Sequence, residues 1–268
     1  MLNGVTPNDT YSRVDAIAYG EDVRQRLDIY QPNHVQKNSG SETPEKMPVV
    51  VFFYGGSWSS GQRSDYKFVG EALAARGIVT VIVDYRIYPQ VRYPGFVEDS
   101  ARAVAWTLQN IEQYGGDVKR VFVMGHSAGA YNAAMVALDA RWLAPHHLTP
   151  GVLRGWIGLA GPYNFLPIQP EAVKSIFVYP DTPFDTQPIA HVTRAAPPVF
   201  LGIAIDDSVV NSQINTTQLA AKLRAANVSV TERSYSGVSH STLMGAFARP
   251  LRGLAPVLQD VTDFVLTQ

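Results

Sequence analysis

A serine between two glycines, at the start of an alanine-rich stretch, has the setting of a nucleophile. The motif Gly-His-Ser-Ala-Gly places Ser127 at its centre and directly follows the apolar run Val121–Met124. This order predicts a strand, a sharp turn and a helix, which is the arrangement of a nucleophile elbow. The serine then lies at the helix N-terminus, where backbone N–H groups and the helix dipole stabilise a developing negative charge. We predict that Ser127 is a catalytic nucleophile; a serine that only caps the helix is the alternative.

A serine hydroxyl becomes nucleophilic when a base takes its proton. The candidate bases are the six histidines, His34, His126, His146, His147, His191 and His240. His240 follows the last predicted strand, Val228–Tyr235, and is the expected base. His191, at the end of a proline-rich segment, is the alternative. The side chain of His126 is expected to point away from that of Ser127.

The imidazole in turn needs a carboxylate that orients it. Asp206 and Asp207 follow the predicted strand Val199–Ile205, which gives the chain order Ser, Asp, His that accompanies a nucleophile elbow. Adjacent residues at a strand end point to opposite sides, and so only one of the two can face the histidine. The pattern Asp-x-x-Val fits both. Aligning the pair Val209-Val210 favours Asp207 as the acid, with Asp206 as the alternative.

A loop with two glycines, after the first predicted parallel strand, can supply N–H groups to an oxyanion. It reads Tyr54-Gly55-Gly56-Ser57-Trp58. Glycine lets the backbone turn its amides towards a substrate oxygen, which a larger side chain would obstruct. We predict an oxyanion hole formed by the amides of Gly56, Ser57 and Ala128.

Short apolar runs alternate with longer amphipathic stretches, which predicts an α/β fold with a mostly parallel central sheet and helices on both faces. After an edge hairpin, predicted strands cover 49–53, 78–83, 121–124, 155–159, 199–205 and 228–235, and predicted helices cover 65–76, 96–114, 127–140, 215–226 and 260–266. Residues 33–47 are polar and predict a surface loop. Residues 161–197 hold seven prolines, too many for a long helix or a central strand. We predict one catalytic domain, 1–268, in which about 161–197, together with 142–148, forms a small irregular cap.

Composition removes several classes of partner. The formal net charge is −1 and 17% of residues are charged, compared with about 25% in a typical chain, so the electrostatic basis for binding nucleic acid is missing. The sequence has no cysteine and no metal-ligand cluster, and we expect neither metal nor cofactor. No run of about 18 apolar residues indicates a membrane span. Met1–Gly4 does not begin a signal segment, so a cytoplasmic location is expected. Nothing in the sequence indicates an oligomeric state.

With these motifs the chain resembles α/β-hydrolase-fold carboxylesterases, in the branch related to hormone-sensitive-lipase-type esterases, kynurenine formamidases and bacterial feruloyl-esterase-like proteins. The resemblance runs from Arg-Leu-Asp-Ile-Tyr at 26–30 to the C-terminal helix, through Gly-Gly-Ser-Trp at 55–58, Asp-Tyr-Arg at 84–86, Tyr-Pro at 93–94, the elbow, and the acid and histidine loops. It implies a triad without metal or cofactor, carried over to Ser127, His240 and Asp207. One position departs from the family: Tyr54 stands where its members usually have histidine, so the support of the loop differs.

We predict a serine hydrolase that cleaves carboxylic esters of small or medium apolar acyl or aryl groups through an acyl-enzyme, with a small-molecule ester as its partner. Trp58 and Tyr66 are candidates for the substrate-binding wall opposite the cap, with the core as the alternative place for either. An arylformamidase acting on N-formylkynurenine is the alternative enzyme, because it needs the same machinery. A non-catalytic binding module is the third reading, and the presence of all three triad residues argues against it.

Overall fold

A single sheet runs through the protein. The computed structural model describes residues 2–33 and 45–268, and within these residues eight strands form one sheet in the order β1-β2-β4-β3-β5-β6-β7-β8. The strands are β1 (Tyr11–Ala18), β2 (Arg26–Pro32), β3 (Met47–Phe53), β4 (Val79–Val83), β5 (Gly116–His126), β6 (Gly155–Leu159), β7 (Val199–Ala204) and β8 (Val230–Tyr235). β2 pairs in antiparallel fashion with both β1 and β4, and the pairs from β4 to β8 are parallel. The predicted α/β fold with a mostly parallel sheet is confirmed.

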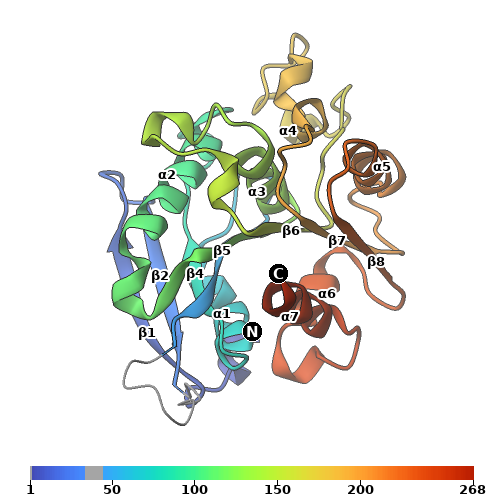
Figure 1. Ribbon diagram of the computed structural model, residues 1–268. Coiled ribbons are helices and arrows are strands. Elements are labelled where there is room, and N and C mark those ends of the chain that lie inside the picture. Colours follow the sequence, from blue (N-terminus) through green and yellow to red (C-terminus); the bar gives the residue numbers. More distant parts are fainter. Residues whose placement is uncertain (1, 34–44) are drawn as a thin grey trace.

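Helices cover both faces of this sheet. They are α1 (Lys67–Ala74), α2 (Gly95–Asn110), α3 (Ala128–Leu138), α4 (Glu171–Lys174), α5 (Gln218–Ala225), α6 (His240–Gly245) and α7 (Val257–Thr267). Figure 1 shows α2 and α3 on one side of the sheet and α1 and α7 on the other. The central strands are therefore enclosed by helices, and their carboxyl ends meet at one edge of the sheet.

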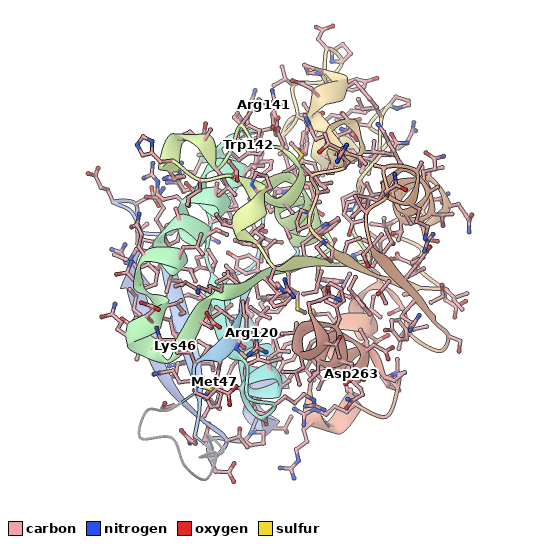
Figure 2. The ribbon with its side chains drawn as sticks, viewed as in Figure 1. Lys46, Met47, Arg120, Arg141, Trp142 and Asp263 are labelled. Atoms are coloured by element: carbon pink, nitrogen blue, oxygen red, sulfur yellow. The ribbon has the colours of Figure 1, made fainter. Side chains whose placement is uncertain are left out.

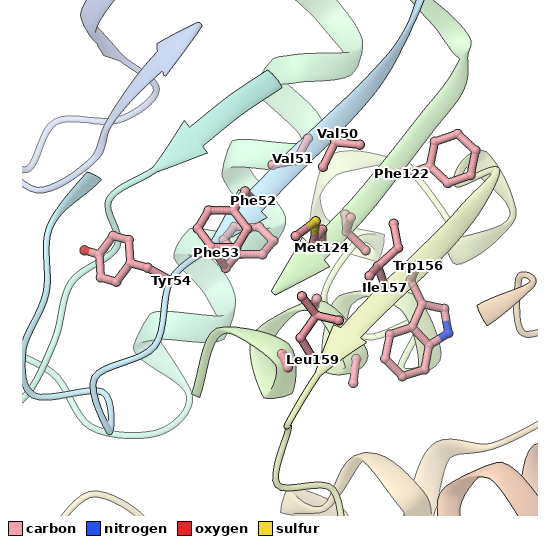
Figure 3. Packing of buried hydrophobic residues seen from close by; sticks show 14 of the residues in the cluster. Val50, Val51, Phe52, Phe53, Tyr54, Phe122, Met124, Trp156, Ile157 and Leu159 are labelled. Carbon is pink, nitrogen blue, oxygen red and sulfur yellow. The ribbon is translucent and has the colours of Figure 1, made fainter. Parts of the chain in front are cut away.

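Enclosure on both faces explains the apolar strand sequences. β4, β6 and β7 are buried along their whole length, because a sheet covered on both sides has no solvent-facing row of side chains. Figure 3 shows side chains of β3, β5 and β6 packed together, among them Phe52, Met124 and Ile157, all fully buried. The ring of Tyr54, at the end of β3, points away from this group (Figure 3).

The boundaries of several elements differ from those predicted. The helix expected at 65–76 begins as a 3₁₀ turn, Arg63–Tyr66, and continues as α1. The helix expected at 96–114 is α2 followed by a 3₁₀ turn that ends at Gly115, whose φ of 79° is left-handed, a conformation that glycine adopts without strain. β5 begins five residues earlier than the apolar run, at Gly116. The helix α6 was not predicted.

The proline-rich segment 161–197, called the cap segment below, has little regular structure. It holds the one-turn helix α4 and 3₁₀ turns at Phe184–Thr186 and Pro188–His191, and Figure 1 shows it reaching beyond the end of β6 around α4. Arg141 Nη1 donates to Asp185 of the cap segment at 3.0 Å, and its guanidinium lies 5.5 Å from the centre of the Trp142 ring (Figure 2). The division into one domain with a cap stays a prediction.

One predicted element lies mostly outside the described residues. Most of the predicted surface loop 33–47, including His34, lies outside the described residues. Across residues 2–33 and 45–268, no helix has the length and apolar character needed to cross a membrane.

Candidate active site

The candidate site lies where the parallel strands end. Gly55 follows β3, Ser127 follows β5, Asp207 follows β7 and His240 follows β8. Because the carboxyl ends of parallel strands lie at the same edge of a sheet, residues distant in sequence meet there.

Ser127 occupies a strained turn between β5 and α3. Its φ of 54° and ψ of −124° are rare for a residue with a side chain and cost about 1–3 kcal/mol. Its N–H donates to the carbonyl of Leu159 at 2.9 Å. A Cβ added at Gly125 would lie 2.1 Å from the Gly129 oxygen, and one at Gly129 would lie 2.0 Å from the Phe53 oxygen. Both glycines of the motif are therefore required for the close packing that holds the turn.

Three predicted residues form a continuous row of hydrogen bonds. Ser127 Oγ lies 2.9 Å from His240 Nε2, and His240 Nδ1 lies 2.7 Å from Asp207 Oδ2. A carboxylate only accepts, so Nδ1–H donates to Asp207 and Nε2 accepts from the serine hydroxyl. The side chains of His240 and Asp207 are 11% and 3% exposed. The row is thus shielded from water, which would compete for these bonds.

The two adjacent aspartates have different surroundings. The second oxygen of Asp207, Oδ1, accepts the N–H groups of Val209 and Val210 at 2.8 and 2.9 Å, so its carboxylate is held from both sides. Asp206 is exposed to solvent. Asp207, and not Asp206, faces His240.

The loop 55–61, called the oxyanion loop below, brings its amides to the same place. Gly56 has a φ of 124° and Ser57 a φ of 50°, and the carbonyl of Gly56 accepts the N–H groups of Ser59 and Ser60, each at 3.0 Å. Ser57 and Ala128 line the same pocket as Ser127, whereas Gly56 does not. Within the described part of the chain, the N–H groups of Ser57 and Ala128 make no hydrogen bond with the protein. These two amides are therefore available to a ligand oxygen.

An apolar pocket of about 320 Å³ opens beside Ser127. One wall is Trp58, another is the first part of the cap segment, and a third is the segment 209–215 that follows the acid. The lining residues are Ser57, Trp58, Ser127, Ala128, Pro162, Phe165, Leu166, Pro167, Gln169, Pro170, Val173, Val209, Val210, Asn211, Ile214 and Asn215. None of them carries a charge, so the pocket suits an uncharged, apolar group.

The structure places the two candidates for the binding wall differently. Trp58 lines the pocket, and its Nε1–H donates to Asn132 Oδ1 at 3.0 Å, which fixes the ring. Tyr66 is not among the lining residues; its ring stacks on that of Tyr54, with the centroids 5.4 Å apart. Residues 142–148 and the second half of the cap segment also lie outside the pocket.

Comparisons with known proteins find one family model and several relatives that resemble this chain. The family model BD-FAE matches residues 27–146, which include the oxyanion loop and Ser127. Esterase LipC of Mycobacterium tuberculosis is 30% identical over 214 residues, covering 72% of this chain and 51% of LipC. The probable isoprenylcysteine alpha-carbonyl methylesterase ICMEL1 of Arabidopsis thaliana is 27% identical over 280 residues, covering 94% of this chain and 55% of the relative. The chain thus spans about half the length of these two relatives.

Solved structures share the fold over nearly the whole chain. A truncated carbohydrate esterase from gut microbiota superposes with a TM-score of 0.77, covering 97% of this chain and 98% of that one at 18% identity. The propionate-bound esterase Est2 of Thermogutta terrifontis gives a TM-score of 0.74, covering 97% and 94% at 19% identity. Residues 27–146 thus resemble the BD-FAE family, and the whole chain has the fold of these solved esterase structures.

In this chain, Tyr54 supports the oxyanion loop in place of the histidine that the resemblance implies. The ring of Tyr54 is fully buried between Tyr66 and Tyr85, with centroids at 5.4 and 4.9 Å. Its hydroxyl donates to Asp84 Oδ1 at 2.8 Å and accepts from Arg24 Nη2 at 2.7 Å. Tyr54 therefore joins the start of the loop to a buried charged network.

The same network also holds the far end of the oxyanion loop. Arg24 Nη2 donates to the carbonyl of Gly61 at 2.8 Å. A Cβ added at Gly61 would lie 2.8 Å from the Tyr54 ring, and Gly61 has a φ of 100°, so only glycine fits over the tyrosine. The departure from the family's histidine thus leaves both ends of the loop anchored.

The segment 209–215 is the part of the site that sequence reasoning missed. Val209 and Ile214 are 65% and 43% exposed, yet both line the pocket. Apolar residues that directly follow a catalytic acid, in an otherwise polar stretch, are a signal that could have indicated a binding wall. Among the residues with described positions, no group of three or more His, Cys, Asp or Glu side chains is arranged to hold a metal ion.

His126 is a buried titratable group next to the row of hydrogen bonds. Its ring lies 4.8 Å from that of His240, and its Nε2 lies 2.9 Å from the carbonyl oxygen of His240. Burial, followed by the neighbouring His240, lowers the pKa of His126 from 6.5 to about 4. The unfolded chain therefore binds more protons than the folded one between these two values, and stability falls as the pH is lowered through this range.

We expect His126→Gln, which does not titrate, to reduce the loss of stability in acid. Between about pH 7 and about pH 4.5 the wild type should lose on the order of 2 kcal/mol of unfolding free energy more than the variant. Urea unfolding of both proteins at the two pH values measures this difference. Equal losses in the two proteins would contradict the lowered pKa of His126.

Proposed function

We propose that the chain hydrolyses carboxylic esters of small or medium apolar acyl or aryl groups through an acyl-enzyme on Ser127. The observation that carries the proposal is the row Asp207–His240–Ser127, with bonds of 2.7 and 2.9 Å, at the mouth of an uncharged apolar pocket. The names of the relatives, an esterase and a methylesterase, support ester chemistry.

Each group has one task in the proposed reaction. Ser127 Oγ attacks the ester carbonyl carbon while His240 Nε2 takes the hydroxyl proton, and Asp207 stabilises the imidazolium that forms. The N–H groups of Ser57 and Ala128, which line the pocket, bind the negative oxygen of the tetrahedral intermediate. The imidazolium then gives its proton to the departing alcohol oxygen as the C–O bond breaks, leaving the acyl group on Ser127.

Water completes the cycle. His240 Nε2 takes a proton from a water molecule, whose oxygen attacks the acyl carbon, and returns that proton to Ser127 Oγ as the acid leaves. No cofactor is needed, because every proton that moves is held by His240 or water.

The pocket predicts how activity depends on the acyl chain. Each methylene buried in an apolar pocket contributes about 0.8 kcal/mol, so kcat/KM should rise about fourfold per methylene until the pocket is full, and then fall. We expect the maximum at short or medium p-nitrophenyl esters. Initial rates over a series from acetate to dodecanoate measure the profile.

Variants of one residue type sharpen this test. Leu166 lines the pocket, and Leu166→Ala should move the maximum to longer chains; Leu254, 44% exposed and outside the pocket, provides the matched control Leu254→Ala. A profile that is the same in both variants would contradict the assignment of the pocket. Faster turnover of N-formylkynurenine than of any ester in the series would replace the proposal with an arylformamidase.

A further inference from the structure

His126 lies next to the oxyanion loop, the serine turn and His240, whose relative positions must be kept for catalysis. It is the last residue of β5, directly before Ser127, and it is 7% exposed. A Cβ added at Gly55 would lie 3.2 Å from His126 Nδ1 and 3.0 Å from Ser127 Cβ. The ring is therefore buried among the oxyanion loop, the serine turn and His240.

The hydrogen bond of His126 has a defined direction. A carbonyl oxygen only accepts, so Nε2–H of His126 donates to the main chain of His240 at 2.9 Å. The titratable groups that face the ring are His240 and Asp207. Near neutral pH the ring is uncharged and Nδ1 carries no proton, so the bond forms without placing a second positive charge beside His240.

This bond ties the base to the nucleophile independently of the reacting atoms. Within the described residues, only two hydrogen bonds join residues 125–129 to residues 239–242: the one between Ser127 Oγ and His240 Nε2, and the one from His126 to the His240 carbonyl. The first is broken and remade during catalysis. Of these two hydrogen bonds, the second is the one that joins the main chain of α6 to the serine turn throughout the reaction.

We propose that His126 is a positioning residue; this inference rests on the proposed hydrolase chemistry. Its Nε2–H fixes the main chain of His240, so that the imidazole stays within reach of Ser127 Oγ at each proton transfer. Because His126 acts through His240 and lies away from the apolar pocket, its loss should lower kcat and leave KM nearly unchanged.

A pair of variants that differ only in reach tests this role. The side-chain amide nitrogen of glutamine is as many bonds from Cα as Nε2 of histidine, whereas that of asparagine is one bond shorter. His126→Gln can therefore donate to the His240 carbonyl, and His126→Asn cannot reach it. We expect His126→Gln to keep kcat within about twofold of the wild type and His126→Asn to lose about tenfold, the value of one hydrogen bond, with KM within about twofold in both.

The measurement uses p-nitrophenyl butyrate below the melting temperature of every variant, with His147→Asn, at an exposed histidine, as the matched control. His126→Asn as active as His126→Gln, or His126→Gln as impaired as His126→Asn, would overturn the proposal. Failure of the proposed function looks different: the wild type would not hydrolyse the ester, or Ser127→Ala would hydrolyse it equally well.

Discussion

Ser127→Ala is expected to lower kcat for p-nitrophenyl butyrate by about 10⁴-fold or more. The variant has no nucleophile, and only direct attack by water at the oxyanion site remains. Within the described residues, Ser127 Oγ makes one hydrogen bond, to His240. Because alanine removes only this hydroxyl and leaves the Cβ in place, the folded structure should be retained. Initial rates and thermal unfolding of the same preparations separate these two effects.

The matched control is a serine-to-alanine substitution outside the candidate site. Ser175 lies exposed after α4 and away from the pocket beside Ser127, so Ser175→Ala should have the activity of the wild type. A folded Ser127→Ala protein that keeps kcat within about tenfold of the wild type would exclude the acyl-enzyme mechanism.

Asp207→Asn is expected to have the second largest effect, about 10⁴-fold in kcat. The carboxylate accepts Nδ1–H of His240; an amide that presents its NH₂ group instead favours the other tautomer, in which Nε2 carries the proton and cannot take that of Ser127. Asp206→Asn is the matched control and should stay within about twofold of the wild type, because Asp206 is exposed.

The steady-state rates of these two variants decide the identity of the acid. If Asp206→Asn abolished turnover and Asp207→Asn did not, the loop after β7 would have a different arrangement during catalysis. A loss of activity in both variants would mean that the carboxylates act together.

The positions of the candidate triad residues could be predicted because they depend on local patterns. The elbow motif requires its glycines sterically, at Gly125 and Gly129, and strand ends bring Ser127, Asp207 and His240 together whatever the details of packing. The choice of Asp207 over Asp206 followed from the Val209-Val210 pair, and those two amides bind the Asp207 carboxylate in the structure.

Other features depend on contacts between distant segments, which a local pattern does not contain. Tyr66 packs on Tyr54 instead of lining the pocket, and only residues 162–173 of the cap segment reach the site. The side chain of His126 was expected only to point away from the side chain of Ser127. Its contact with His240 depends on α6, a helix of six residues. One local signal for α6 was present: Ser239 and Thr242 form a capping box at its start.

The most direct test of the account is the covalent labelling of Ser127. The folded wild type is treated with a fluorophosphonate, its intact mass is measured, and the labelled peptide is sequenced by mass spectrometry. The account predicts a single adduct on Ser127 that is absent from Ser127→Ala. A wild-type mass that stays unchanged, or an adduct on any other residue, would contradict it.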